Sequence, residues 1–468
     1  FKKMPNTLAI SILLLAFFAS IVFNGFFRNI AKKNKILIDI PDKSRKFHFN
    51  ETALTGGLGI FCSILVSGLL LTDFTDAKYS VDLGEKGFLK NSIFNDGLIT
   101  KNYQVDSKNY NLSIDNKNNE SINVIIKDNT TNENITDLPL EIIPISENKF
   151  KVILPDGTQK FYVSESENIY EISPNNEIKS NQFSPVSTDL NNVKINNTSI
   201  AAFLCMFLIL IFMIFDDFIG IRAIYRLIFQ SSVVFLMIMM SEEYIFNIGN
   251  LLNTGDIYLG NFAIPFTIFC VVGLMNAFNM IDGLNGICAA FALVPIIFIT
   301  LFGNFSYGLL IPIGSILGFL AYNMGFLGKK RRVFLGDSGS NILGFLVAFL
   351  CIEYTQNSNN PYLLNPVTAL WLVAIPLVDC INVMISRVMR GIGPFDPGRD
   401  HLHHKLLSFG IKPKRIFYIF ISFSVTLSSI GFIIEKNFSE QAYISFLAFC
   451  IFSMIYLIIT KTALNKNV

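Results

Sequence analysis

Long apolar runs alternate with short polar segments along most of this 468-residue chain. A run of about 18 apolar residues is long enough to cross the hydrocarbon core of a bilayer as a helix. About eleven such windows occur, near residues 5–27, 55–72, 199–215, 223–240, 261–278, 286–302, 305–324, 339–354, 366–387, 416–434 and 440–460. The pattern predicts an all-α polytopic membrane protein with about eleven transmembrane helices.

The segment 73–198 interrupts this pattern. It is rich in Asn, Ser, Asp and Glu and contains neither arginine nor cysteine. Within it, the stretches INVIIKD and KVILPDGTQKFYV alternate apolar with polar residues, and the second contains a Pro-Asp-Gly turn. Such alternation around a turn favours β-hairpins. We therefore predict three parts: residues 1–72 with two helices and a first polar loop, a β-rich insertion over 73–198, and residues 199–468 with the remaining helices.

Lysine and arginine concentrate in alternate loops, at 28–46, 222–226, 329–332 and 387–415, whereas the loops SEEYIFNIGNLLNTGDIYLGN and EYTQNSNNPYLLN have almost none. Basic loops remain on the cytoplasmic side of a membrane. The pattern therefore predicts an extracytoplasmic amino terminus and an extracytoplasmic insertion. Composition agrees with a membrane protein, because 51% of the residues are hydrophobic and only 15% are charged, which is unusual for a soluble domain.

Three acidic or amide-bearing motifs fall at the predicted cytoplasmic ends of the helices. They are DD after the third window, NAFNMIDGLNG after the fifth and GDSGS before the eighth, and they contain Asp216, Asp217, Asn276, Asn279, Asp282 and Asp337. Ionisable residues at membrane depth are costly and commonly functional. The alternative interpretation is an ordinary solvated helix end.

A fourth motif, DPGRDHLHHKL, follows the ninth window and holds three of the four histidines in the chain, His401, His403 and His404, beside Arg399. A zinc site is one interpretation, but the spacing fits zinc poorly and no cysteine is nearby. Basic side chains placed opposite aspartates favour an anionic substrate instead. We therefore favour phosphate binding.

Together the four motifs indicate transfer between phosphates. Magnesium prefers oxygen ligands, commonly one or two carboxylates completed by water and substrate phosphates. Cationic side chains and the metal then offset the charge of the transferred phosphoryl group. A position at the lipid boundary implies one lipid substrate and one soluble substrate.

The ordered motifs resemble those of the polyprenyl-phosphate N-acetylhexosamine-1-phosphate transferases, a family with WecA-like and MraY-like branches. The first polar loop adds a fifth match, IDIPDKSRKFH followed by GGLGIF. The likeness covers nearly all of the chain except 73–198. The histidine motif is similar to that of the WecA-like branch, since the MraY-like branch carries three consecutive histidines. One departure is Gly398, which stands where the family often has an acid.

The resemblance implies transfer of N-acetylglucosamine 1-phosphate, or of a related N-acetylhexosamine 1-phosphate, from a UDP-sugar to undecaprenyl phosphate with release of UMP. This reaction initiates cell-envelope polysaccharide synthesis. The expected partners are a UDP-N-acetylhexosamine, undecaprenyl phosphate and membrane lipid, with no nucleic acid and with a homodimer as a further expectation. The expected location is the bacterial inner membrane, with the active site facing the cytoplasm. The alternative within the family is transfer of phospho-MurNAc-pentapeptide.

The resemblance also assigns roles to residues. Asp337 would be the principal Mg²⁺ ligand and Asn279 the second, with Mn²⁺ as an alternative ion. The expected catalytic residues are Asp216 and Asp217, which would orient or deprotonate the lipid phosphate, and Asp282, which would organise the nucleotide end. The expected substrate-binding residues are Arg45, His48, Asn276, Arg399, His401, His403 and His404.

Two hypotheses from other classes remain. A transporter would also place acids within helices, near paired broken segments at the bilayer midplane. A non-catalytic scaffold would use the membrane helices only to present the insertion, and it would have no need of acids at the membrane.

Overall fold

The computed structural model describes residues 6–40, 51–74, 197–303, 306–356, 364–393, 398, 400–438 and 441–465, together with eight strands between residues 98 and 183. The chain divides into two compact units. The first comprises Phe1–Asp73 and Asn197–Val468, and the second is Phe74–Asn196. Each unit is described separately below.

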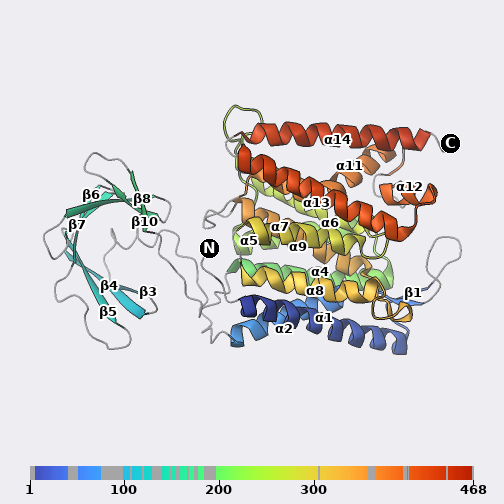
Figure 1. Ribbon diagram of the computed structural model, residues 1–468, viewed down its shortest axis with the longest axis horizontal. Helices are drawn as coiled ribbons and strands as arrows, with labels where there is room; N and C mark the ends of the chain where they lie inside the picture. Colours follow the sequence, from blue (N-terminus) through green and yellow to red (C-terminus); the bar gives the residue numbers. More distant parts are fainter. Residues whose placement is uncertain are drawn as a thin grey trace. The chain divides into compact units, whose positions relative to one another are not determined.

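The first unit is a bundle of helices (Figure 1). Their bounds are α1 Asn6–Asn34, α2 Gly56–Phe74, α4 Asn197–Ile219, α5 Ala223–Ser241, α6 Ala263–Ile281, α7 Ile287–Phe302, α8 Tyr307–Asn323, α9 Gly336–Gln356, α10 Pro366–Leu372, α11 Ala374–Met389, α12 Leu402–Ser408, α13 Pro413–Asn437 and α14 Ala442–Asn465. Each of the eleven apolar windows coincides with one of these helices, or with the pair α10 and α11.

Seven of the described helices are long and apolar enough to cross a membrane, or eight if the bent pair α10 and α11 counts as one span. The chain is thus a helical multi-pass membrane protein. The predicted count of about eleven spans is not confirmed, because α7 (Ile287–Phe302) and α8 (Tyr307–Asn323), with 16 and 17 residues, are shorter than the other expected spans. At a rise of about 1.5 Å per residue, such helices reach about 25 Å at most, short of a hydrocarbon core of about 30 Å.

The predicted single helix over 366–387 is broken in the structure. Helices α10 and α11 meet at an angle of 80° around Val373. Pro376, the third residue of α11, has no N–H to donate to the carbonyl of Leu372, and a continuous helix would place its ring against that carbonyl. Among the described residues this is one bent pair and not the two that a transporter would use.

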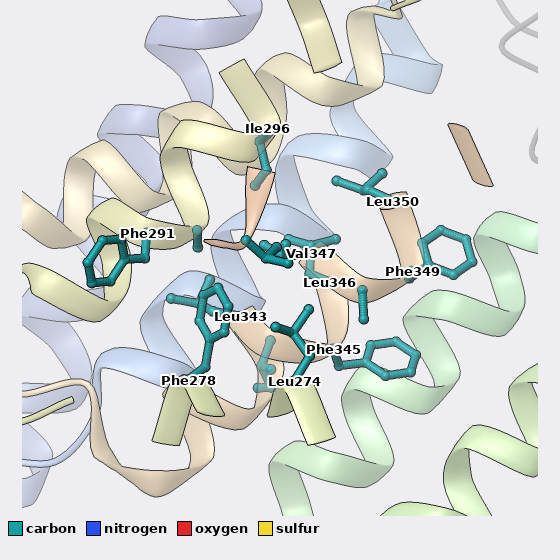
Figure 2. Packing of buried hydrophobic residues seen from close by; sticks show 14 of the residues in the cluster. Leu274, Phe278, Phe291, Ile296, Leu343, Phe345, Leu346, Val347, Phe349 and Leu350 are labelled. Carbon is teal, nitrogen blue, oxygen red and sulfur yellow. The ribbon is translucent and has the colours of Figure 1, made fainter. Parts of the chain in front are cut away.

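Helix α9 forms the centre of the bundle and is the most buried of the candidate spans. Its side chains, among them Phe345 and Val347, belong to one buried cluster with Phe278 of α6 and Phe291 of α7 (Figure 2). Gly344 permits this packing, since a Cβ there would lie 2.8 Å from the Cα of Met275. The close approach of α6 and α9 brings the end of α6 beside the start of α9.

The first polar loop is attached to the segment that leads into α9. Strands β1 (Ile38–Asp39) and β2 (Thr52–Ala53) pair, and Ala53 bridges to Val333. Gly57 lies against the first turn of α9, where a Cβ would be 2.6 Å from the Gly339 nitrogen. The GGLGIF motif therefore positions the start of α9. Arg45 and His48 of this loop lie outside the described residues.

The second unit contains a sheet of eight antiparallel strands paired in sequence order. The strands are β3 Leu98–Val105, β4 Lys108–Asn118, β5 Ser121–Asp128, β6 Leu140–Ser146, β7 Lys149–Ile153, β8 Gln159–Glu165, β9 Asn168–Ile172 and β10 Ile178–Phe183. The first segment expected to form a strand lies in β5, and the second spans β7 and β8. The side of the membrane on which this unit lies remains a prediction.

Candidate functional site

The paired aspartates lie at the end of α4, where the backbone turns back over the first of them. Gly220 has a positive φ of 71°, and its N–H donates to the Asp216 carbonyl at 2.8 Å. A glycine in this conformation is a common helix C-terminus. The Ile221 N–H then donates to Asp216 Oδ1 at 2.6 Å, so this carboxylate is buried and fixed.

Arg226, in the first turn of α5, joins the acids of two helices. Its Nη1 lies 3.1 Å from Asp216 Oδ2 and 3.5 Å from Asp337 Oδ2. Asp217 lies close by, since a Cβ on Gly336 would be 3.6 Å from Asp217 Oδ2. That oxygen is buried and has no hydrogen-bond partner among the described residues. Three carboxylates thus gather around one guanidinium, and this excess of negative charge favours a further cation.

The same place contains the oxygen donors that suit magnesium. Ser340 Oγ lies 2.9 Å from Asn279 Oδ1, which brings the Asn279 amide to the first turn of α9 beside Asp337. Within the described residues, no group of three or more His, Cys, Asp or Glu side chains is arranged to hold a metal ion. Magnesium commonly takes only one or two protein carboxylates. Asp337, Asn279 and the unpartnered Asp217 oxygen therefore fit an ion whose shell is completed by water and phosphate.

A chain of amide side chains connects α5, α6 and α9 behind these acids. Asn276 Nδ2 donates to Gln230 Oε1 at 2.9 Å and to the Val272 carbonyl at 2.8 Å. Gln230 Nε2 donates to Asn341 Oδ1 at 2.7 Å, and Asn341 Nδ2 donates to the Asp337 carbonyl at 2.8 Å. Both amide hydrogens of Asn276 are occupied, so its predicted contact with substrate is limited to Oδ1.

The histidine motif forms a short helix instead of the predicted loop, with His401 just before α12. His401 and His403 are buried, and their rings are nearly parallel with centroids 5.7 Å apart. Burial, together with the neighbouring His404 and His401 rings, lowers the pKa of His403 to about 3. The His403 ring is therefore neutral near pH 7, and neither of its nitrogens has a partner among the described residues.

Asp400 pairs with two arginines at the end of α11. Arg387 Nε lies 3.2 Å from its Oδ2, and Arg390 Nη2 lies 3.0 Å from its Oδ1. Burial acts to raise the Asp400 pKa, but these hydrogen bonds and charges outweigh it, so the pKa is below its usual value. A Cβ on Gly398 would lie 2.7 Å from both Arg387 Nη2 and Asp400 Oδ2. A side chain at this position would therefore require the Arg387–Asp400 pair to shift. Arg399 lies outside the described residues.

These elements enclose a cavity of about 320 Å³, at the small end of the range for ligand sites. Its polar lining comes from α5, the end of α6, α11 and the α12 segment and consists of Arg226, Asn276, Asn279, Asp282, Arg387, His401, His403 and His404. Six of these are predicted site residues. Asp216 and Asp337 do not line the cavity themselves, but both form ion pairs with Arg226, which does.

Asp282 follows the last residue of α6 and lines the cavity. Burial of its carboxyl, and then repulsion by the Asp337 carboxylate, raise the pKa of Asp282 to about 7. A group with this pKa is partly protonated near neutral pH and loses its proton when a cation binds nearby.

Sequence reasoning missed Arg226 and Arg387, because both had served only as markers of the cytoplasmic side. It also missed Asp379 and Tyr456, which contact the histidine segment. An acid within the apolar stretch IPLVDCINV was the available signal for Asp379, since ionisable residues inside spans are commonly functional.

Comparison with known proteins gives the family. The profile of glycosyl transferase family 4 matches residues 199–355. The chain is 32% identical over 248 residues to the undecaprenyl-phosphate alpha-N-acetylglucosaminyl 1-phosphate transferase of Escherichia coli strain K12, covering 52% of this chain and 67% of that protein. It is 32% identical over 263 residues to the enzyme of the same name from Haemophilus influenzae, covering 54% and 72%.

The matched range includes Asp216, Asp217, Asn279, Asp282 and Asp337, the polar residues at the ends of α4, α6 and α9 described above. The resemblance seen in the ordered motifs is thereby confirmed, and the chain belongs to glycosyl transferase family 4.

Proposed function

We propose that this protein transfers N-acetylglucosamine 1-phosphate from UDP-N-acetylglucosamine to undecaprenyl phosphate and releases UMP. The observation that carries the proposal is the cavity in which Arg226, Arg387 and three histidines face Asn279 and Asp282. The names of the similar proteins support the sugar and the lipid acceptor. The histidine sequence H-L-H-H argues against the phospho-MurNAc-pentapeptide transferases.

In the proposed reaction, an oxygen of the lipid phosphate attacks the β-phosphorus of the donor. A bond forms between that oxygen and the β-phosphorus, and the bond from the β-phosphorus to the oxygen of UMP breaks. A phosphate monoester has a second pKa of about 6, so the acceptor is largely a dianion at neutral pH. Asp216 and Asp217 therefore need to position the acceptor and the cation more than to remove a proton.

Magnesium, when held by Asp337 and Asn279 with Asp217 beside them, would offset the charge of the phosphates. Arg226 and Arg387 provide fixed positive charge on the cavity wall for the donor diphosphate. The neutral His403 ring has two buried nitrogens free of protein partners among the described residues, so it can hydrogen-bond the donor without the cost of burying an unpaired charge. Asp282 is assigned to the nucleotide end.

The proposed setting is the bacterial inner membrane with the cavity facing the cytoplasm. The support is the concentration of basic residues in the loops at 222–226, 329–332 and 387–415. The donor is soluble and the acceptor is a lipid, so a cavity at the ends of membrane helices is accessible to both. A homodimer remains an expectation from the family.

The direct test measures UMP release by the purified protein with undecaprenyl phosphate, MgCl₂ and each of several UDP-sugars. We expect turnover with UDP-N-acetylglucosamine and loss of turnover when EDTA replaces magnesium. Undecaprenol, which lacks the phosphate, is the matched acceptor control and should give no UMP. A folded protein that released no UMP with any sugar would contradict the proposal and favour the scaffold hypothesis.

The contact between Gly283 and His403 gives a sharper structural test. A Cβ at Gly283 would overlap His403 Nε2, so Gly283→Ala must displace this ring from the cavity. Because displacement of a substrate-positioning group by about 1 Å can reduce rate about a hundredfold, we expect UMP release to fall by about ten- to a hundredfold.

The matched control for this variant is Gly273→Ala, since a Cβ at Gly273 on α6 meets no atom within 4 Å. The control should retain turnover within about twofold and gain slightly in helix stability. Normal turnover by Gly283→Ala would mean that the position of the His403 ring does not matter for the reaction.

A further inference from the structure

Asp379, in the buried middle of α11, makes three hydrogen bonds around the histidine segment. Its Oδ2 lies 2.7 Å from His401 Nδ1. Its Oδ1 accepts from the Tyr456 hydroxyl at 2.8 Å and from the Leu402 N–H at 3.1 Å. Both Asp379 and His401 are almost completely buried. A buried carboxylate with three donors is fixed in orientation, so it fixes the ring that it contacts.

This geometry determines which nitrogen of His401 is available to a ligand. A carboxylate accepts hydrogen bonds, so the proton on Nδ1 must point to Asp379. His401 lines the cavity, and with Nδ1 engaged the remaining ring atom able to bind a ligand is Nε2. Histidines whose second nitrogen is held by a carboxylate recur where ring orientation and tautomer must be fixed.

Helix α14 holds this arrangement from the far side. Besides Tyr456, it contributes Thr460, whose Oγ1 accepts from Asn382 of α11 at 2.8 Å and whose carbonyl accepts from Lys405 of α12 at 3.4 Å. Two adjacent turns of α14 thus contact both elements that carry the Asp379–His401 pair. The final helix therefore contributes to the site as well as to the bundle.

We propose that Asp379 and Tyr456 are positioning residues that hold His401 with its Nδ1–H on Asp379 and its Nε2 toward the diphosphate of the donor. The proposal rests on the proposed function. With a second proton on the ring, Nε2–H can donate to a phosphate oxygen while Nδ1–H stays on Asp379. The other titratable groups near the pair are His403 and Lys405 of α12 and Arg387 of α11.

A double-mutant cycle on UMP release tests the proposal. Asp379→Asn should reduce kcat/KM for the donor by about ten- to a hundredfold. Losses of this size are common when the group that orients a functional histidine is removed. Tyr456→Phe, which removes one hydrogen bond, should cost about fivefold, whereas Tyr443→Phe on the same helix should cost nothing. In a His401→Gln background, Asp379→Asn should have no further effect, because the ring that it positions is absent. An equal loss in both backgrounds would overturn the proposal and leave Asp379 a purely structural role.

A second readout does not depend on turnover. The chain has four histidines, so the spectrum of protein labelled with ¹⁵N-histidine is simple, and His401→Gln identifies the His401 signals. We expect a protonated Nδ1 for His401 in the wild-type protein and loss of this signature in Asp379→Asn, with the other histidines unchanged. An unchanged His401 spectrum in Asp379→Asn would contradict the proposal. If the wild-type protein releases no UMP, the proposed function fails, while this spectrum still decides whether Asp379 fixes the ring.

Discussion

Replacement of Asp337 by asparagine should lower UMP release on the order of 10³-fold. Asp337 stands in the first turn of α9, partly exposed, beside Asn279 and the unpartnered oxygen of Asp217. Its carboxylate is the accessible negative charge that a divalent cation needs. A loss of metal stabilisation of about 4 kcal/mol in the transition state corresponds to a factor of this size.

The variant should remain folded, because the structural hydrogen bond from Asn341 is accepted by the backbone carbonyl of residue 337 and not by its side chain. Its carbonyl accepts from Asn341 in either form of the side chain. Removal of one of three clustered carboxylates also reduces repulsion, so the melting temperature in EDTA should be unchanged or higher. UMP release and thermal melting with and without magnesium measure both effects.

Asp256→Asn is the matched control, since this exposed aspartate precedes α6 whereas Asn279 and Asp282 are at its other end. The helix separates these positions by about 28 Å, so the control should retain full turnover. Retained turnover in Asp337→Asn, with an unchanged magnesium requirement, would show that the ion is held elsewhere.

Replacement of Arg226 by alanine should lower kcat/KM about a hundredfold. The guanidinium contacts both Asp216 and Asp337 and lines the cavity, so it opposes the charge of the acids and of a bound diphosphate. Removal of one fixed electrostatic group from an active site commonly costs a factor of about 10² to 10³.

Arg226→Ala should also make stability depend more strongly on magnesium. Without the arginine, three carboxylates lack their counter-charge, so the variant should melt at a lower temperature in EDTA than the wild-type protein. Magnesium should narrow this difference, because the ion replaces the lost positive charge. Thermal melting over a magnesium titration measures the effect.

Arg222→Ala is the matched control, because it removes one positive charge just as Arg226→Ala does. Arg222 is exposed and immediately precedes α5, one turn before Arg226. Its loss should change turnover by less than about threefold, as expected for an exposed charge. Equal losses in the two variants would mean that net charge near the membrane matters and that the contacts of Arg226 do not.

The helical class and the main polar motifs were predictable from the sequence, because both depend on local pattern. Apolar runs must form helices in a membrane, where every backbone group needs an internal partner. Acids and amides at the ends of those runs stand out because they are costly there. Asn276, Asn279 and Asp282 were found in this way, and the three histidines were found because they gather in one motif; all six line one cavity.

The breaks and short helices were harder to predict. A window of 18 residues counts apolar residues but does not show where the helix within it ends, so the sequence did not reveal that α7 and α8 have only 16 and 17 residues. Pro376 lay within an apolar run, and proline also occurs inside α7 and α8 without breaking them. Only the packing around each proline decides whether the helix continues.

The sequence by itself determined that this is a helical membrane protein and predicted which polar motifs form its site, since hydropathy and residue type are local properties. The tertiary structure alone decided which side chains meet. Arg226 reaches acids on α4 and α9, and Tyr456 of α14 reaches Asp379 of α11. Such contacts join residues far apart in the chain and follow from how helices pack, for example at Gly344 against Met275. Their energies depend on mutual distance and burial, and neither quantity can be read from a linear pattern.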